Sequence, residues 1–282
     1  MKSSTFYSCL KLYESITIEI EYPSDAFKQI IDLVINIYYK IDRKINIGVV
    51  FSSLSEIFSR KCFCGEVSYH RINQSVDVIP SKKFKKCSQF KKISIPSSVT
   101  KIESHAFYKC STLTQVTFAT PSSLTEIESN AFNKCVSLKQ IDIPSSVTKI
   151  KDYAFSECSS LTQISIPSSL TEIGDHVFSG CSSLLQITIP YSVTKIGNYV
   201  FSGCSSLNQI VIPFSVTKIE SNAFSKCSSL AQFMIPACVT EIGSCSFCEC
   251  SSLTKIIIPS YVLKIRSYTF YRCSSLNQIK IP

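Results

Sequence analysis

Cysteine is the residue type in this sequence that could most readily do chemistry, because it occurs 15 times and mostly at one fixed spacing. Steps of 23 residues, with a single step of 25, separate Cys87, Cys110, Cys135, Cys158, Cys181, Cys204, Cys227, Cys250 and Cys273. Such a column could bind metal or form disulfides, yet a free cysteine usually behaves as a small buried hydrophobic residue. Disulfide geometry is strict, and equivalent stacked positions seldom satisfy it. We therefore predict a structural column, and some bridging under oxidising conditions stays open.

A second cysteine group has the C-x-x-C-x-C spacing of thiolates that could hold a zinc ion, at Cys245, Cys248 and Cys250 with Cys238 nearby. One C-x-x-C pair without a second pair is a weak zinc signal. Cys250 belongs to the column and should point inward, whereas we expect Cys248 to be exposed. Because these side chains should diverge, the sequence predicts no metal site and no cofactor.

The three histidines, His70, His105 and His176, offer little for acid–base catalysis. His105 and His176 fall at equivalent outer-turn positions of different repeats, where we expect them to be solvated. No nucleophile or carboxylate recurs beside them, although a catalytic base must lie within hydrogen-bond reach of its nucleophile. The phosphate-binding patterns GxGxxG and GxxxxGK[ST] are absent as well. We therefore predict that the protein is not an enzyme and has no catalytic residues.

The formal net charge is +9, and part of it is concentrated in one basic segment. The segment contains Lys82, Lys83, Lys85, Lys86, Lys91 and Lys92. Such a run can attract nucleic acid or other polyanions. The neighbouring Phe84 and Phe90 have the spacing of core residues, so a stacking platform for single-stranded nucleic acid is not expected. We predict a solvated face here and no specific nucleic-acid partner.

An internal repeat positions all of these residues and extends over most of the chain. The period of the cysteines is shared by a column of prolines and a column of phenylalanines. The phenylalanines are Phe107, Phe132, Phe155, Phe178, Phe201, Phe224, Phe247 and Phe270. Each unit also has apolar residues in the pattern L-x-x-I-x-I, which one unit alone cannot bury. Neighbouring units must therefore stack, and a period of roughly 20 to 29 residues with this pattern is typical of leucine-rich repeats.

Each unit predicts the same order of local structures. In residues 207–226, for example, Ile210 and Ile212 point inward on a short strand, which the following proline ends because it lacks an N–H donor. A second, outer short strand at 215–219 and a helical turn at 220–226 complete the unit. The predicted fold is an α/β-type repeat solenoid, a leucine-rich-repeat horseshoe of about nine or ten 23-residue units with short parallel strands.

The repeats resemble those of the BspA-like, or Treponema-type, leucine-rich-repeat family. The resemblance rests on Ile-Pro-Ser-Ser-Val-Thr-Lys-Ile at 95–102 and on Ala-Phe-x-x-Cys-Ser-x-Leu-x-x-Ile at 154–164, and it covers about two-thirds of the chain. Members of this family are known as surface proteins of bacteria and protozoan parasites, and some act as adhesins. The resemblance therefore implies non-catalytic recognition of a protein ligand, as a cell-surface adhesin or antigen.

The chain divides into three parts by the regularity of its repeat. Residues 1–50 lie outside it and predict an N-terminal cap or an eroded repeat, with a helix near 25–41. A separate small module is the alternative for this part. Residues 51–94 are degenerate repeats, and residues 95–282 are eight regular repeats. The sequence stops on a repeat boundary at Pro282, where an unpaired strand edge is expected to promote aggregation unless something covers it. A truncated gene product and end-to-end association with a partner are the two alternatives.

The compartment stays open between two alternatives. The family resemblance implies the cell surface or the extracellular space. Residues 1–22, however, carry Glu14, Glu19 and Glu21 and lack the continuous apolar segment of a signal peptide. No segment reaches the roughly 18 to 20 apolar residues of a membrane helix. These features, and the many free thiols, favour an intracellular leucine-rich-repeat scaffold in the cytoplasm as the alternative.

The outward positions of the predicted sheet provide the candidate binding site. One outward position is a column of amides, and at another the polar residues give way to apolar ones in three consecutive units. Aromatic residues also replace serine close to the proline in nearby units. Exposed contiguous apolar surface usually marks a partner site, although drift in a tolerant repeat or self-association would give the same pattern. The predicted protein-binding residues are Tyr191, Val211, Phe214, Met234, Ile257 and Tyr261.

Overall fold

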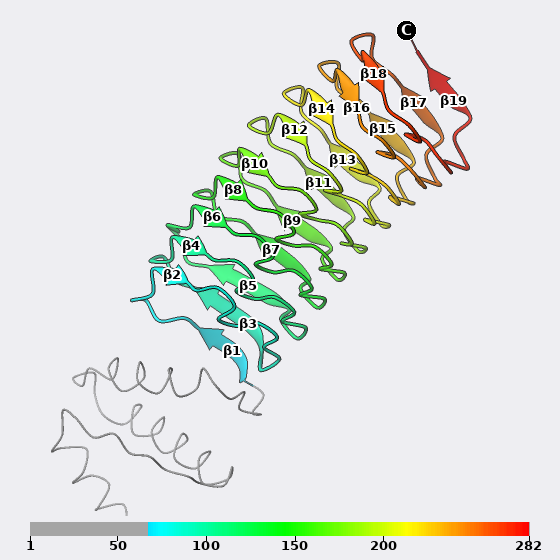
Figure 1. Cartoon of the computed structure of the whole chain (residues 1–282). Coiled ribbons are helices and arrows are strands. Elements are labelled where there is room, and N and C mark those ends of the chain that lie inside the picture. Colours follow the sequence, from blue (N-terminus) through cyan, green and yellow to red (C-terminus); the bar gives the residue numbers. More distant parts are fainter. Residues whose placement is uncertain (1–66, 282) are drawn as a thin grey trace, which may run out of the picture. The chain divides into compact units, whose positions relative to one another are not determined.

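The computed structural model describes residues 67–281. These residues form a parallel β-solenoid of about nine turns, in which a typical turn contributes one longer strand and one two-residue strand (Figure 1). Our expectations for residues 1–50, including the helix near 25–41, and for the first part of 51–94 lie outside the described residues.

The strands alternate in length along the chain. The longer strands are β1 (Val67–Arg71), β3 (Phe90–Ile95), β5 (Gln115–Phe118), β7 (Gln140–Asp142), β9 (Gln163–Ser165), β11 (Gln186–Thr188), β13 (Gln209–Val211), β15 (Gln232–Met234), β17 (Lys255–Ile257) and β19 (Gln278–Lys280). The two-residue strands are β2 (Val78–Ile79), β4 (Lys101–Ile102), β6 (Glu126–Ile127), β8 (Lys149–Ile150), β10 (Glu172–Ile173), β12 (Lys195–Ile196), β14 (Lys218–Ile219), β16 (Glu241–Ile242) and β18 (Lys264–Ile265).

Equivalent residues of neighbouring turns pair in parallel, which confirms the predicted stacking of the repeats. Ile187 lies opposite Ile210, and Ile219 lies opposite Ile242. The longer strands form the sheets β1-β3-β5-β7-β9, β11-β13 and β15-β17-β19, and the two-residue strands form β10-β8-β6-β4-β2 and β12-β14-β16-β18. Within the described turns, the pairing of longer strands is thus interrupted between β9 and β11 and between β13 and β15.

The core is a set of columns in which each residue contacts its equivalent in the next turn. The phenylalanine rings from Phe107 to Phe247 are fully buried and stack nearly parallel, as in the pair Phe107 and Phe132, whose ring centroids are 4.9 Å apart. Leucine and isoleucine columns of the L-x-x-I-x-I pattern surround them. Burial of one phenylalanine stabilises the fold by about 1.5–3 kcal/mol. The predicted aromatic column is therefore a major source of stability.

The predicted helical turns are wrong, because no helix occurs in residues 67–281, and the described part of the solenoid is all-β. In the segment after β4, His105 and Lys109 have left-handed φ angles of 62° and 59°, which interrupt a helix. The Phe107 N–H donates to the Ala131 carbonyl of the next turn at 2.7 Å. A helix would use that donor within its own segment. The N–H groups of the turn segments instead alternate between bonds to the next turn and bonds to the third residue back, such as Cys110 N–H to the Phe107 carbonyl at 3.1 Å.

The cysteine column is buried from Cys110 to Cys273, as predicted for structural residues, and Cys87 is partly buried. The Cys135 thiol donates to the Phe107 carbonyl at 3.1 Å, and the Cys158 thiol donates to the Phe132 carbonyl at 3.2 Å. The same bond recurs at each later turn, so the thiols satisfy carbonyls that face the core. Burial raises the pKa of the Cys181 thiol to about 12, which keeps this group protonated and able to donate.

Candidate binding surface

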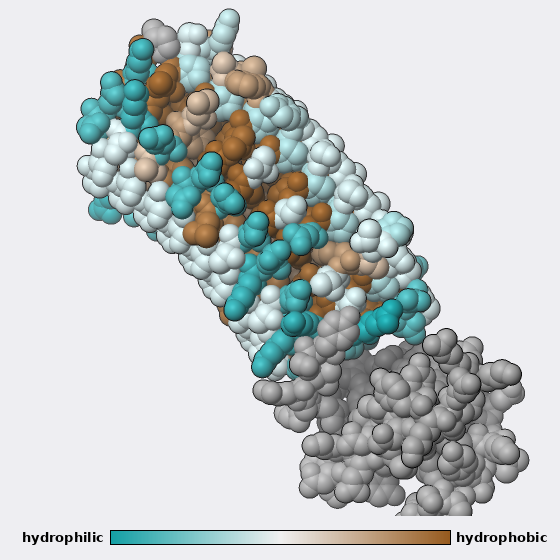
Figure 2. All heavy atoms as spheres, turned by 180° about the vertical axis from the view of Figure 1, so that it is seen from behind, coloured by the Kyte–Doolittle hydropathy of each residue, from teal (hydrophilic) through white to brown (hydrophobic). Residues whose placement is uncertain are grey.

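The longer strands carry exposed apolar side chains toward the C-terminal half of the solenoid. Alternate residues of a strand point to opposite faces, so Val211 on β13, Met234 on β15 and Ile257 on β17 all point outward. Met234 has 83% of its surface exposed, and the other two are also exposed. Figure 2 shows a hydrophobic band along one face of the solenoid, with hydrophilic side chains beside it.

The structure brings only some of these strand residues into direct register. Met234 lies opposite Ile257 in the ladder between β15 and β17. Val211 is paired with Thr188 of β11, and β13 belongs to a different sheet from β15. The three apolar residues therefore follow one another on consecutive longer strands, but ladder hydrogen bonds fix only Met234 and Ile257 side by side.

The three predicted aromatic residues lie in the turns that follow the longer strands, and all are exposed. Tyr191 and Phe214 occupy equivalent positions just after a proline in consecutive turns. Tyr261 lies one position further along its turn, and the turn that contains exposed Cys238 separates it from Phe214. We use the term apolar patch for the full set of predicted residues, which is Tyr191, Val211, Phe214, Met234, Ile257 and Tyr261.

The surroundings of the apolar patch are polar and carry little charge. An outward amide column crosses the same strands at Gln186, Gln209, Gln232 and Gln278. Lys255 and Lys280 are the charged residues at the outward positions of β11, β13, β15, β17 and β19, and no carboxylate occupies those positions. The face can therefore contact apolar side chains and donate hydrogen bonds to main-chain carbonyls without burying an unpaired acid.

Sequence reasoning missed several exposed apolar side chains. Leu185, immediately before β11, is exposed at a position where neighbouring turns have Thr162 and Asn208. A column-by-column comparison of all outward positions could have found it. The last described turn adds exposed Leu263, Ile265, Ile279 and Ile281.

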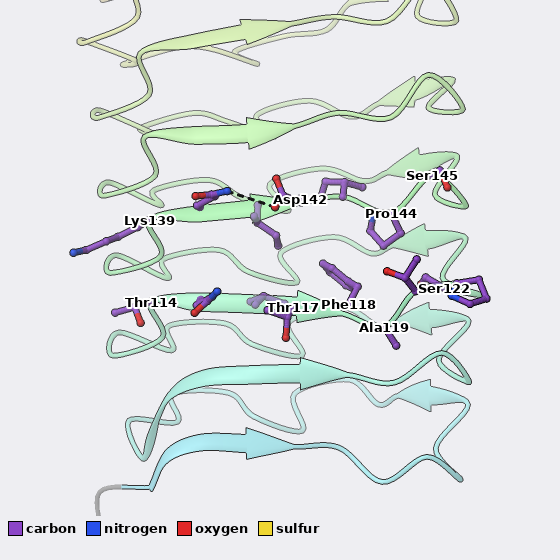
Figure 3. A pocket seen from close by; sticks show the side chains of 16 residues that line it. Thr114, Thr117, Phe118, Ala119, Ser122, Lys139, Asp142, Pro144 and Ser145 are labelled. Atoms are coloured by element: carbon purple, nitrogen blue, oxygen red, sulfur yellow. Dashed lines mark hydrogen bonds between the residues drawn. The ribbon is translucent and has the colours of Figure 1, made fainter.

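A hollow of about 810 Å³ lies where the repeat has its single 25-residue step (Figure 3). The extra residues weaken the pairing of β5 with β7, which share only the register pair Gln115 and Gln140. The Gln140 side chain donates to Asp142 Oδ2 at 3.4 Å within this hollow. Its lining is made mainly of hydroxyl, amide and aliphatic groups, so it offers contact surface rather than a nucleophile with a base.

The other candidate groups from the sequence lie outside the apolar patch. Within residues 67–281, no group of three or more His, Cys, Asp or Glu side chains is placed to hold a metal ion. The expectation that Cys248 is exposed is wrong, because its side chain is buried. The six clustered lysines are all exposed, as predicted for a solvated face, and Phe90 beside them is buried. None of the residues 67–281 belongs to a helix that could cross a lipid bilayer.

The repeat columns identify the family to which this solenoid belongs. The BspA type leucine rich repeat region matches in six copies, over residues 77–208 and 171–282. The chain belongs to the BspA-type leucine-rich-repeat family. The BspA-type resemblance seen in the sequence is thereby confirmed. No curated protein shows significant sequence similarity to the chain.

Solved structures of leucine-rich-repeat proteins are similar to this chain. A leucine-rich repeat protein from Bacteroides ovatus ATCC 8483 is 28% identical, with a TM-score of 0.63, over 76% of this chain and 69% of its own. The leucine-rich repeat protein of T. pallidum is 31% identical, with a TM-score of 0.54, over 60% of this chain and 80% of its own. A leucine rich cell surface protein from Faecalibacterium prausnitzii A2-165 is 23% identical, with a TM-score of 0.34, over 78% and 89%.

Proposed function

We propose that this BspA-type protein is a non-catalytic recognition module that binds a protein ligand through the apolar patch. The observation that carries the proposal is the exposure of Met234 on β15, beside Ile257 on β17. Exposure of large apolar side chains to water is unfavourable and their burial against a partner lowers the free energy, so a contiguous exposed group usually marks a site for a partner.

The chemistry of the surrounding face suggests what kind of ligand fits. The amide column can bond to polar groups at the rim, where water has partial access. Because β11, β13, β15, β17 and β19 present Lys255 and Lys280 and no outward carboxylate, a neutral or acidic protein surface with apolar side chains is complementary to this part of the face. The absence of an outward acid on these five strands also means that none of their carboxylates has to be desolvated when an apolar ligand docks there.

A charge placed at Met234 tests the proposal. The full chain is immobilised and probed with a panel of purified extracellular proteins, and every ligand found is measured again with Met234→Asp. We expect affinity to fall by at least about tenfold, because the carboxylate must be desolvated in the interface. Thr117→Asp is the matched control, since it adds the same charge at the equivalent exposed position of β5, outside the apolar patch. Unchanged binding of every ligand by Met234→Asp would exclude the apolar patch.

We further propose that recognition takes place at the cell surface, as in an adhesin or antigen, which the family resemblance supports. An intracellular scaffold is the second candidate, and the buried column thiols from Cys110 to Cys273, which form no disulfides, favour it, because such thiols persist in a reducing compartment.

Accessibility on intact cells separates the two candidates. Antibody or protease added to unpermeabilised cells reaches an adhesin, whereas a scaffold is reached only after permeabilisation. A cytoplasmic marker protein, measured in the same cells, controls for leakage. Detection only after permeabilisation would remove the adhesin proposal and leave the scaffold.

A further inference from the structure

The turn segments, rather than the strands, form a second groove of about 430 Å³. It is separate from the apolar patch in both sequence and chemistry. Its lining residues are His105, Tyr108, Asn130, Asn133, Lys134, Tyr153, Ser156, Glu157, His176 and Ser179. Ligand pockets for small molecules typically begin at about 300 Å³, so the groove has room for one sugar-sized group.

Asn133 contributes a buried acceptor without a donor to this groove. Its side chain is only 7% exposed, and Nδ2 donates to Asn130 Oδ1 at 2.6 Å. Asn133 Oδ1 accepts no hydrogen bond from any of residues 67–281. The equivalent position in the next turn is Ser156, whose hydroxyl donates to the Ser179 carbonyl at 3.1 Å. Buried polar atoms are nearly always paired, so the Asn133 amide is suited to a donor supplied by a ligand.

Aromatic residues stand on both sides of the two asparagines. In the preceding turn, His105 and Tyr108 meet edge to face at 5.4 Å. In the following turns, Tyr153 stacks on His176 with ring centroids 4.3 Å apart. Asn130 occupies the position between His105 and Tyr153, and its shorter side chain leaves a depression between them. Two turns of the stack span roughly 9.6 Å, which leaves space for one non-planar ring between aromatic side chains.

The position that presents Tyr153 is unfavourable for an aromatic residue. Tyr153 has a left-handed φ of 58°, where asparagine or glycine fits with less strain, and Asn130 and Asn222 fill the same position in other turns. The same left-handed φ recurs at this position in the other regular turns, for example at His176, Tyr199 and Tyr268, so it is a property of the repeat and does not by itself mark a site. The rim adds a paired charge, because Lys134 Nζ lies 3.1 Å from Glu157 Oε1. Since the pair offers donors and acceptors with no net charge, it does not favour an ionic ligand.

We propose that this groove binds a neutral pyranose unit of a saccharide. A C–H face of the pyranose packs on the aromatic side chain of Tyr153. Its hydroxyl groups can donate to Asn133 Oδ1 and exchange hydrogen bonds with Lys134 and Glu157.

Saturation-transfer NMR on the full chain tests the proposal, with the methyl glycosides of glucose, galactose, mannose and N-acetylglucosamine as probes. We expect at least one probe to bind with a Kd on the order of 1 mM. Asn133→Ser and Tyr153→Asn should each weaken it by about tenfold, through loss of the acceptor and of an aromatic face. Both variants place a side chain that the solenoid already has at the equivalent position, so they should fold.

Tyr199→Asn is the matched control, because Tyr199 stacks on the far side of His176 and does not line the groove. It should leave the saccharide signal unchanged, as should Met234→Asp in the apolar patch. The absence of binding by all four probes at about 20 mM would overturn the proposal. Binding that Asn133→Ser and Tyr153→Asn do not weaken would overturn it as well, since the sugar would then occupy another site.

Discussion

The column thiols add a second hydrogen bond to phenylalanine carbonyls of the core. The Phe155 carbonyl accepts from the Cys158 main-chain N–H at 3.2 Å, and the Cys181 thiol donates to the same carbonyl, also at 3.2 Å. Burial disfavours the thiolate, which raises the pKa of Cys181 from its ordinary value of 9.0 to about 12. The protonated thiol therefore stabilises the fold at neutral pH, and its ionisation at alkaline pH destabilises the fold.

Alkaline pH should therefore destabilise the fold through these thiols. The folded pKa of Cys181 lies above the unfolded value, so its contribution is complete below pH 9.0 and is lost as pH rises toward about 12. Urea unfolding at pH 8 and pH 10 measures the effect. The variant Cys181→Ala should lose about 1.4 kcal/mol less stability over this interval than the wild type. Equal losses in both proteins would show that Cys181 does not titrate in this way.

The histidines show how a residue in an exposed turn can acquire a defined environment. We expected His176 to be solvated, but its ring lies between those of Tyr153 and Tyr199, with centroid distances of 4.3 and 4.4 Å. Burial lowers its pKa, while the nearby Asp175 and Asp152 act in the opposite direction. The expectation failed because the sequence places these three residues 23 apart and does not show that their rings stack.

In the turn segments, close approach of successive turns depends on individual glycines. A Cβ added at Gly243 would lie 2.5 Å from the backbone of Glu220 and Ser221 in the preceding turn. The segment therefore packs backbone against backbone there. Gly203 differs, because its φ is 76° and a Cβ would meet its nearest neighbour, Gly180, only at 3.6 Å.

Gly243→Ala should lower the free energy of unfolding by about 1–3 kcal/mol, because the turns must move apart to admit the methyl group. Gly203→Asn is the control, since asparagine tolerates a left-handed φ and the position has room. We expect the control to change stability by less than about 0.5 kcal/mol. Urea denaturation of both variants measures the difference. A larger loss of unfolding free energy in Gly203→Asn than in Gly243→Ala would contradict the close backbone packing described for Gly243.

Along the whole solenoid, stability is a sum of contacts between neighbouring turns, because each turn touches little else. Phe178 has a ring partner on both sides, Phe155 at 6.1 Å and Phe201 at 5.6 Å. Phe270 is half-buried and stacks on Phe247 at 5.7 Å. The same side chain therefore contributes differently according to its place in the stack.

Phe178→Ala should cost about 3–5 kcal/mol of unfolding free energy, as expected for a cavity in a fully packed core. Phe270→Ala should cost clearly less, because its site is already partly open to solvent. Equilibrium unfolding of the full chain in urea, followed by far-UV circular dichroism, compares the two variants. Equal costs would argue against additive contacts between neighbouring turns.

The amino-acid sequence alone determined the period, the parallel stacking, the inward columns such as Phe178 and Cys181, and the outward position of Met234. These properties follow from the spacing of apolar residues within one repeat, which is a local property repeated along the chain. The exposed strand residues of the apolar patch were predictable for the same reason, since alternation on a strand fixes which face each residue takes.

Only the tertiary structure determined to which carbonyl each main-chain N–H of the turn segments donates. The Phe107 N–H bonds to Ala131 of the next turn, and no helix forms in residues 67–281. It also decided that Asn133 keeps a buried acceptor between aromatic residues of neighbouring turns. Both outcomes depend on the distance and orientation of residues 23 or more positions apart. Spacing along the chain carries no information about them, because they are fixed only when the turns pack.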